Sequence, residues 1–286
     1  MWKKLRRSVR DHVPNALSAK LVAASVAARS RMGAALHRAR AGPSGFPRLD
    51  DGLYERLYES HAHAMPPESS IGSGDFDLIG RIELGALQSA GLNAASTLVD
   101  FGCGTGRLAV HAVPFLAKGR YIGTDISKSM LDMARERVAA VVRQTTCRVE
   151  FIKQQPDRFH VAPESADFVC AFSVFTHMEH EDTYRYLVAA RKAVRPGGRF
   201  VLSCLPISLT VSCDIFLASA NIAFSERWQQ VRNVATSTEL MEAVARLAGW
   251  RPVCWYAGDK SQIPMPGTGE LRALGQSVLV LEKSLH

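Results

Sequence analysis

The most constraining feature of the sequence is a glycine-rich loop that follows a short apolar run. The run over residues 97–101 carries Asp100 near its end, and glycine then occupies positions 102, 104 and 106. The run is typical of a buried parallel strand, and residues 107–116 are predicted to form the helix after the loop. Glycine lets a ligand lie close against the main chain, beside the free N–H groups of a helix N-terminus. The loop therefore predicts a binding site for a nucleotide-type cofactor.

The spacing of the glycines departs from the dinucleotide pattern G-x-G-x-x-G, because Arg107 occupies the position of its third glycine. A second strand is predicted over residues 120–124, and Asp125 follows it. A carboxylate about 20 residues after a glycine loop is expected to accept hydrogen bonds from both ribose hydroxyls. The alternative is an ordinary acidic residue at the end of a strand.

Two further segments extend this pattern. Residues 166–177 form an apolar strand that runs into a polar tip, and residues 194–203 combine Pro-Gly-Gly with another strand. Taken in order, the four motifs resemble those of the class I S-adenosylmethionine-dependent methyltransferases, over roughly residues 75–284. The resemblance implies S-adenosyl-L-methionine as the cofactor and methyl transfer as the reaction.

The predicted fold class is α/β, a doubly wound Rossmann-like sheet with helices on both faces. The strands that alternate with helices are expected near residues 97–101, 120–124, 148–152, 166–172 and 199–203. A capped helix that starts near Ser237 precedes two more strands, near residues 252–256 and 277–282. The resemblance implies a mainly parallel seven-stranded sheet with one antiparallel strand, to which an N-terminal helical extension is added.

The resemblance also implies a set of cofactor-binding residues. Asp100 supports the glycine loop, Asp125 holds the ribose hydroxyls and Ile126 packs on the adenine ring. A third acid usually ends the third strand, but this chain has Gln155 there and Asp157 two residues later. Both stay candidates, because a glutamine oxygen accepts the same hydrogen bond. The full predicted set is Asp100, Gly102, Cys103, Gly104, Gly106, Asp125, Ile126, Gln155, Asp157 and Phe172.

His177 is the predicted catalytic residue, because it follows the fourth strand and histidine titrates near neutral pH. The competing interpretation is a histidine that packs and orders its loop. His61 and His63 are further candidate bases. No metal site is predicted, because the acidic cluster at residues 179–182 lacks a histidine pair at i, i+4 spacing and suits the first turn of a helix.

The chain is predicted to divide into a basic amphipathic extension and linker, residues 1–45, and a methyltransferase domain, residues 46–286. Ten of the first forty residues are lysine or arginine, and Asp11 is the one acid among them. Such a segment is compatible with peripheral contact of residues 1–41 with an anionic membrane, and the alternatives are a transit peptide, a plain solvated extension or helices packed on the domain. Within the domain, residues 204–236 interrupt the alternation and are predicted to cap the acceptor pocket.

Composition limits the remaining choices. Six scattered cysteines without a C-x-x-C pair favour a reducing compartment, and no apolar stretch is long enough to span a bilayer. We therefore expect a cytoplasmic protein, with the inner face of a membrane as an optional contact. Beyond the basic extension the charges nearly balance, so nucleic acid is not expected as a partner.

The predicted function is O-methylation of a hydroxyl on a small molecule or a glycan. The candidate histidine, the apolar cap and the lack of an Asn/Asp-Pro-Pro-aromatic tetrad favour this acceptor. The alternatives are an RNA methyltransferase recruited by the basic extension and a non-catalytic partner subunit that binds S-adenosylmethionine. The oligomeric state is left open.

Overall fold

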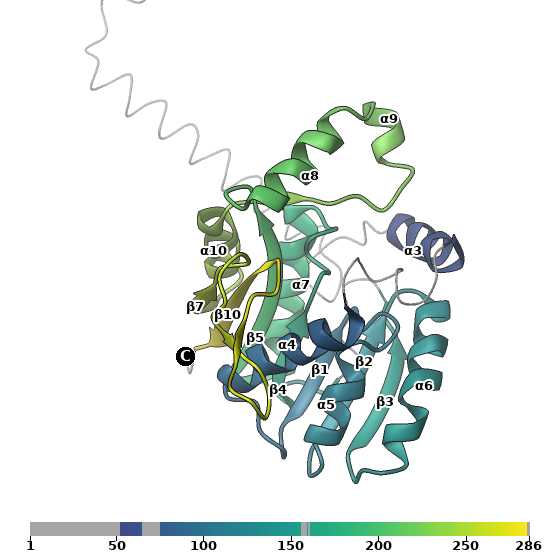
Figure 1. Ribbon diagram of the computed structural model, residues 1–286, viewed down its shortest axis with the longest axis vertical. Helices are drawn as coiled ribbons and strands as arrows, with labels where there is room; N and C mark the ends of the chain where they lie inside the picture. Colours follow the sequence, from purple (N-terminus) through teal and green to yellow (C-terminus); the bar gives the residue numbers. More distant parts are fainter. Residues whose placement is uncertain (1–51, 65–74, 156–158, 160, 285–286) are drawn as a thin grey trace, which may run out of the picture. The chain divides into compact units, whose positions relative to one another are not determined.

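A mainly parallel sheet lies at the centre of the described chain, which the computed structural model gives over residues 52–64, 75–155, 159 and 161–284 (Figure 1). Seven of its eight strands follow the order β3-β2-β1-β4-β5-β10-β7, and β10 runs antiparallel to both of its neighbours. The short β6 pairs with β5 beside this path. The predicted mainly parallel sheet with one antiparallel strand is confirmed.

The strands of this sheet are β1 (Thr97–Phe101), β2 (Arg120–Asp125), β3 (Arg148–Lys153), β4 (Ala166–Ala171), β5 (Val194–Pro206), β6 (Ala235–Thr236), β7 (Trp250–Tyr256) and β10 (Ser277–Lys283). A separate pair joins β8 (Ile263–Pro264) to β9 (Leu271–Arg272). The helices are α3 (Leu53–Ala64), α4 (Phe76–Ser89), α5 (Ala109–Phe115), α6 (Lys128–Val142), α7 (His180–Ala193), α8 (Thr210–Ala220), α9 (Phe224–Arg227) and α10 (Thr238–Leu247).

Some of the sequence predictions fall outside the described residues. They concern the basic extension over residues 1–45 and Asp157, so the predicted membrane contact of residues 1–41 stays a prediction. Within the part of the chain that the structure describes, no helix combines the length and apolar character needed to cross a bilayer.

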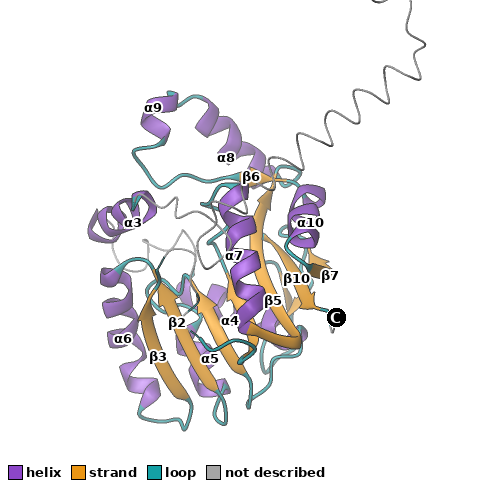
Figure 2. Cartoon of the chain, turned by 180° about the vertical axis from the view of Figure 1, so that it is seen from behind, coloured by secondary structure: helices purple, strands orange, loops and turns teal. Residues whose placement is uncertain are grey.

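The sheet separates two hydrophobic cores because successive side chains of a strand point to opposite faces. Leu98 and Val201 point into the core that α4 and α5 cover, whereas Val99 and Leu202 point into the core that α7 and α10 cover. All four of these strand residues are fully buried. Figure 1 shows α4 and α5 in front of the sheet, and Figure 2, from behind, shows α7 in front of it. Helices therefore cover both faces, as predicted.

Two boundaries differ from the sequence predictions for backbone reasons. Helix α5 begins at Ala109 rather than at residue 107, because residues 104–108 form turns, and Gly106 with its φ of +86° cannot itself belong to a helix. The Pro-Gly-Gly segment lies inside β5, where Ala166 pairs with Val194 but Phe168 already pairs with Arg199. The extra residues form a bulge in β5, so the strand is longer than predicted.

Helix α3 is held at the carboxyl ends of the parallel strands by polar contacts with other elements. The Tyr54 hydroxyl donates to Asp182 of α7 at 2.8 Å, and Glu55 pairs with Lys153 of β3 at 2.5 Å. Glu59 accepts the backbone N–H of Lys128, the first residue of α6, also at 2.5 Å. These contacts place the aromatic side chains of α3 above the sheet edge where ligands bind in open α/β folds.

Candidate active site

The glycine loop between β1 and α5 is a tight backbone cradle. Gly102, Gly104 and Gly106 all adopt positive φ angles, +74°, +52° and +86°. The backbone N–H groups of Gly102 and Cys103 both donate to the carbonyl of Thr124 in β2, at 2.8 and 2.9 Å. A Cβ on Gly102 would lie 2.4 Å from Cγ2 of Val174. Only glycine therefore fits at position 102, because both the conformation and the space exclude a side chain.

Asp125 ties the end of β2 to this loop. Its Oδ2 accepts the backbone N–H of Gly104 and its Oδ1 accepts the backbone N–H of Ser127, both at 2.9 Å. Burial raises the pKa of the Asp125 carboxyl to about 6, although these two hydrogen bonds oppose the rise. Each carboxylate oxygen keeps a second lone pair, so the group can still accept hydrogen bonds from two hydroxyls of a ligand.

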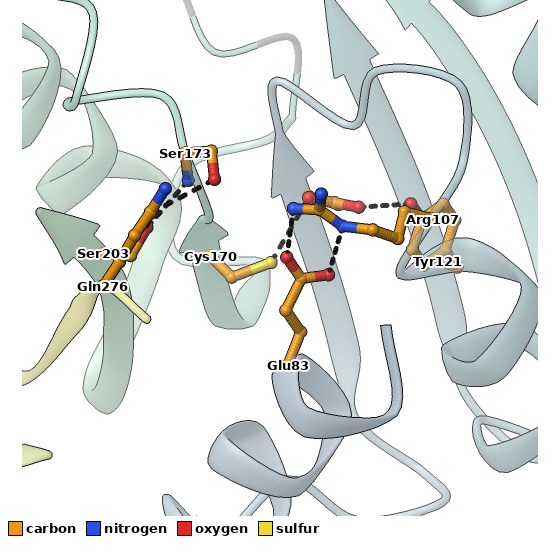
Figure 3. Close-up of polar contacts among 8 residues, drawn as sticks. Glu83, Arg107, Tyr121, Cys170, Ser173, Ser203 and Gln276 are labelled. Carbon is orange, nitrogen blue, oxygen red and sulfur yellow. Dashed lines mark hydrogen bonds and ion pairs between the residues drawn. The ribbon is translucent and has the colours of Figure 1, made fainter. Parts of the chain in front are cut away.

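Asp100 is the second buried carboxyl group of the site. The Tyr121 hydroxyl donates to its Oδ2 at 2.5 Å, and the Cys170 thiol donates to its Oδ1 at 3.4 Å (Figure 3). Burial raises the pKa of Asp100 to about 7. Neighbouring strands thus hold Asp100 from both sides, β2 through Tyr121 and β4 through Cys170.

Next to Asp100, a buried ion pair joins Glu83 of α4 to Arg107 of the glycine loop (Figure 3). The guanidinium donates to both carboxylate oxygens, at 2.5 and 3.3 Å, and both side chains are almost fully buried. Gly80 lets α4 approach the loop closely enough for this ion pair to form. A Cβ at position 80 would lie 2.5 Å from the Arg107 carbonyl oxygen and would push α4 away from the loop. The sequence predictions missed Glu83, although an acid between Ile82 and Leu84 in an apolar helix is a visible signal.

A cavity of about 550 Å³ connects these groups at the carboxyl ends of the strands. Its walls include most of the predicted cofactor residues, Asp100, Gly102, Cys103, Gly104, Asp125, Ile126 and Phe172. Gly106 does not line the cavity. It faces α6 instead, where a Cβ added at position 106 would lie 3.4 Å from Ala134. Gln155 is exposed and does not line the cavity, whereas the buried Gln154 does.

His177 lines the same cavity, beyond the end of β4. Its Nδ1 lies 2.9 Å from the carbonyl oxygen of Arg232, and because a carbonyl only accepts, Nδ1 carries the proton. Burial lowers the pKa of His177, which keeps the ring neutral near pH 7 with its lone pair on Nε2. Arg232 is itself held, since its guanidinium pairs with Glu179 and lies 4.5 Å from the ring centroid of Trp228.

The remaining walls come from elements that are far apart in the sequence. Tyr54, Tyr58 and His61 come from α3, Val211 and Ile215 from α8, and Leu274 and Gln276 from the segment before β10. His61 therefore reaches the cavity, whereas the side chain of His63 is outside the described part. Most of the wall around His177 is aromatic or aliphatic, which suits an acceptor with an apolar body.

Comparison with known proteins identifies the domain. Residues 99–200 match a family model described as a methyltransferase domain, over the segment from β1 to β5 that carries the glycine loop and Asp125. This part of the chain is a methyltransferase domain. The expected family, enzyme class and cofactor are thereby confirmed.

Solved structures of low sequence identity share the fold of this methyltransferase domain. One is a SAM-dependent methyltransferase from Methanosarcina mazei, at 13% identity and a TM-score of 0.54, covering 70% of this chain and 98% of that chain. Another is magnesium protoporphyrin IX methyltransferase from Synechocystis PCC 6803 with bound SAH, at 16% identity and a TM-score of 0.58, covering 82% of this chain and 100% of that chain. At these identities the likeness concerns the fold alone.

The residues present in the methyltransferase domain fit S-adenosylmethionine. The cradle at Gly102 excludes a side chain and leaves main chain facing the cavity. The Asp125 carboxylate matches two ribose hydroxyls, and the Glu83–Arg107 pair offers both charges to a zwitterionic amino-acid end. A buried pair of that kind can exchange part of its mutual interaction for one with a ligand that carries an ammonium and a carboxylate.

Proposed function

We propose that this methyltransferase domain transfers a methyl group to a hydroxyl oxygen of a small molecule or a glycan, with His177 as the general base. The observation that carries the proposal is the Nδ1–H hydrogen bond from His177 to the Arg232 carbonyl, on the wall of the cofactor cavity. That bond leaves Nε2 as a lone-pair acceptor for a proton. The bound cofactor supplies a methyl group on a positively charged sulfur.

In this proposal the cofactor is held by Asp125 at its ribose and by Glu83 and Arg107 at its methionine end. Asp100, which Tyr121 and Cys170 hold in place, contributes a further carboxylate beside the glycine loop. After β3, Gln154 rather than the predicted Gln155 would contact the cofactor, because Gln154 is the glutamine of that pair that lines the cavity. These groups would orient the bound cofactor toward the acceptor, and alignment alone can supply several kcal/mol of the barrier.

His177 then removes the proton of the acceptor. His177 Nε2 would accept the hydroxyl proton of the acceptor while the bound cofactor supplies the methyl group and is left as the neutral thioether. The imidazolium that forms still donates from Nδ1 to the Arg232 carbonyl, which stabilises the added charge. Because burial lowers the pKa of His177 in the free protein, its ring is neutral at pH 7 and can accept a proton.

The segment over residues 204–236 serves as the cap of the acceptor pocket in this proposal. Val211 and Ile215 of α8 line the cavity, as do Val231 and Asn233 of the segment that follows α9. Arg232, between the last two, carries the carbonyl that orients His177. The cap thus combines an apolar wall for the acceptor with the hydrogen bond that sets the tautomer of the base.

The test is His177→Asn, assayed by label transfer from methyl-labelled cofactor to a library of hydroxyl compounds. The asparagine amide can still donate to the Arg232 carbonyl, so the loop keeps its contact while the base is lost. We expect turnover to fall about 10²–10⁴-fold with cofactor affinity unchanged. A variant that retains the wild-type rate would return His177 to a purely structural role.

A further inference from the structure

A second polar cluster lies on the cavity wall, outside the cofactor groups and His177. It joins Ser173, just after β4, to Ser203 of β5 and Gln276, just before β10 (Figure 3). The backbone N–H of Ser173 donates to Ser203 Oγ at 2.7 Å. The hydroxyls of Ser203 and Ser173 both donate to Gln276 Oε1, at 2.6 and 3.2 Å.

These contacts determine which way the Gln276 amide faces. Ser203 is fully buried and accepts the Ser173 N–H, so its own proton is directed to Gln276 Oε1. A carbonyl oxygen has two lone pairs, and the two serine hydroxyls occupy both of them. Ser173 also has a φ of +57°, a conformation that residues other than glycine rarely adopt. Ser203 holds that backbone through its hydrogen bond.

The amide nitrogen of Gln276 is the part of the cluster left for a ligand. Gln276 lines the cavity and is partly exposed, and none of its hydrogen bonds to the described residues uses Nε2. Val174 and Leu274, which line the same cavity, offer no polar side-chain atom. The group therefore presents two N–H donors, in a fixed orientation, to whatever occupies this side of the cavity.

A donor fixed in this way recognises an oxygen lone pair on the ligand. Two properties of the wall favour a neutral oxygen over a carboxylate. Asp100 and Asp125 line the same cavity, and Arg107, the one described lining residue with a full positive charge, is paired with Glu83. A carboxylate on the ligand would therefore lie near two groups of like charge, and the described wall offers it no further cation to offset them.

We propose that Gln276 is a specificity-determining residue that donates from Nε2 to a neutral carbonyl oxygen of the methyl acceptor. The acceptor then carries two features, the hydroxyl that faces His177 and a ketone-type oxygen that faces Gln276. This inference rests on the proposed function, because it assumes that the acceptor occupies the cavity beside His177. It adds the chemical class of the acceptor, a hydroxyl compound with a carbonyl group.

The test compares binding of phenol, para-hydroxyacetophenone and para-hydroxybenzoate, and of the same trio on a naphthalene ring, to protein loaded with S-adenosylhomocysteine. The variant is Gln276→Glu, which keeps an oxygen for both serine hydroxyls but replaces the N–H donors with an acceptor. Gln144→Glu, at an exposed turn after α6, is the matched control. Cofactor affinity and melting temperature report on whether the cluster itself survives.

In the wild type and the control we expect the ketone member of a trio to bind about tenfold more tightly than the parent hydroxyl compound. In Gln276→Glu we expect that preference to vanish while cofactor affinity stays unchanged. The proposal is overturned if the preference survives in Gln276→Glu, if the carboxylate member binds best, or if no ketone member is preferred in the wild type. Ketone selectivity through Gln276 without any methyl transfer would instead count against the proposed function alone.

Discussion

Replacing Asp125 with asparagine tests the link between the end of β2 and cofactor binding. Asp125 accepts one backbone N–H on each oxygen, from Gly104 and from Ser127, at 2.9 Å each. Asparagine has one oxygen, so its amide group faces one of these donors and also loses the charge that ribose hydroxyls would meet. A hydrogen bond to a charged group contributes roughly 1.5–3 kcal/mol, so cofactor affinity is expected to fall about 10–150-fold.

Stability should change much less than affinity, because two effects of Asp125→Asn oppose each other. Burial raises the Asp125 pKa from its ordinary 3.8 to about 6, so the charged form lowers the unfolding free energy by roughly 3 kcal/mol at pH 8. Removing the charge relieves this. One backbone N–H without an acceptor costs about 1–3 kcal/mol in return. The melting temperature of the variant is therefore expected within a few degrees of wild type.

The assay is calorimetric titration with S-adenosylhomocysteine between pH 5 and pH 8. In the wild type, the Asp125 carboxyl has a pKa of about 6 in the free protein, and we expect bound ribose hydroxyls to lower that pKa toward 3.8. Cofactor affinity should therefore fall about tenfold between pH 8 and pH 5, where the free carboxyl is mostly protonated. Asp125→Asn should lose that share of the pH dependence. Asp132→Asn, on the exposed surface of α6, is the control and should match wild type. Wild-type affinity in Asp125→Asn at pH 8 would refute the reasoning.

Two further predictions concern the buried ion pair and the basic extension. Glu83→Ala should lower the unfolding free energy by about 3–5 kcal/mol, because it leaves a buried guanidinium without its carboxylate, whereas Glu83→Leu combined with Arg107→Met should restore most of the stability in denaturant titrations. The double variant should nevertheless bind S-adenosylhomocysteine more weakly, and wild-type binding by it would make the pair purely structural. Deletion of residues 1–41 should abolish sedimentation with anionic vesicles, to which each basic residue contributes ~1 kcal/mol near the surface, and should leave cofactor affinity intact. Lost cofactor binding in the truncated protein, or vesicle binding that survives truncation, would contradict this.

Groups that lie close together in the sequence were predictable. Asp100 and the three glycines sit within seven residues, and Asp125 follows at the end of the next strand. The carboxyl ends of neighbouring parallel strands meet at one edge of a sheet, so the position of each residue in its strand was enough to bring them together. Strand periodicity also predicted the sheet and its two faces.

The prediction for the segment after β3 was wrong by one position, because it named Gln155 whereas Gln154 lines the cavity. Because side chains of an extended segment alternate, neighbours at a strand end face opposite sides. The motif located the strand end, but only the packing after β3 decided that Gln154 is buried at the cavity and Gln155 is exposed.

The sequence by itself determined the fold class and the glycine-rich cradle, because those depend on local backbone geometry and on strand order, and its four motifs carried the resemblance that implied the cofactor. Only the tertiary structure decided the partners that come from distant segments. Glu83 reaches Arg107 across 24 residues, the Arg232 carbonyl reaches His177 across 55, and Gln276 reaches Ser203 across 73. Such contacts depend on how helices and loops pack on the sheet. A hydrogen bond between residues far apart in the sequence produces no periodic pattern from which it could be predicted.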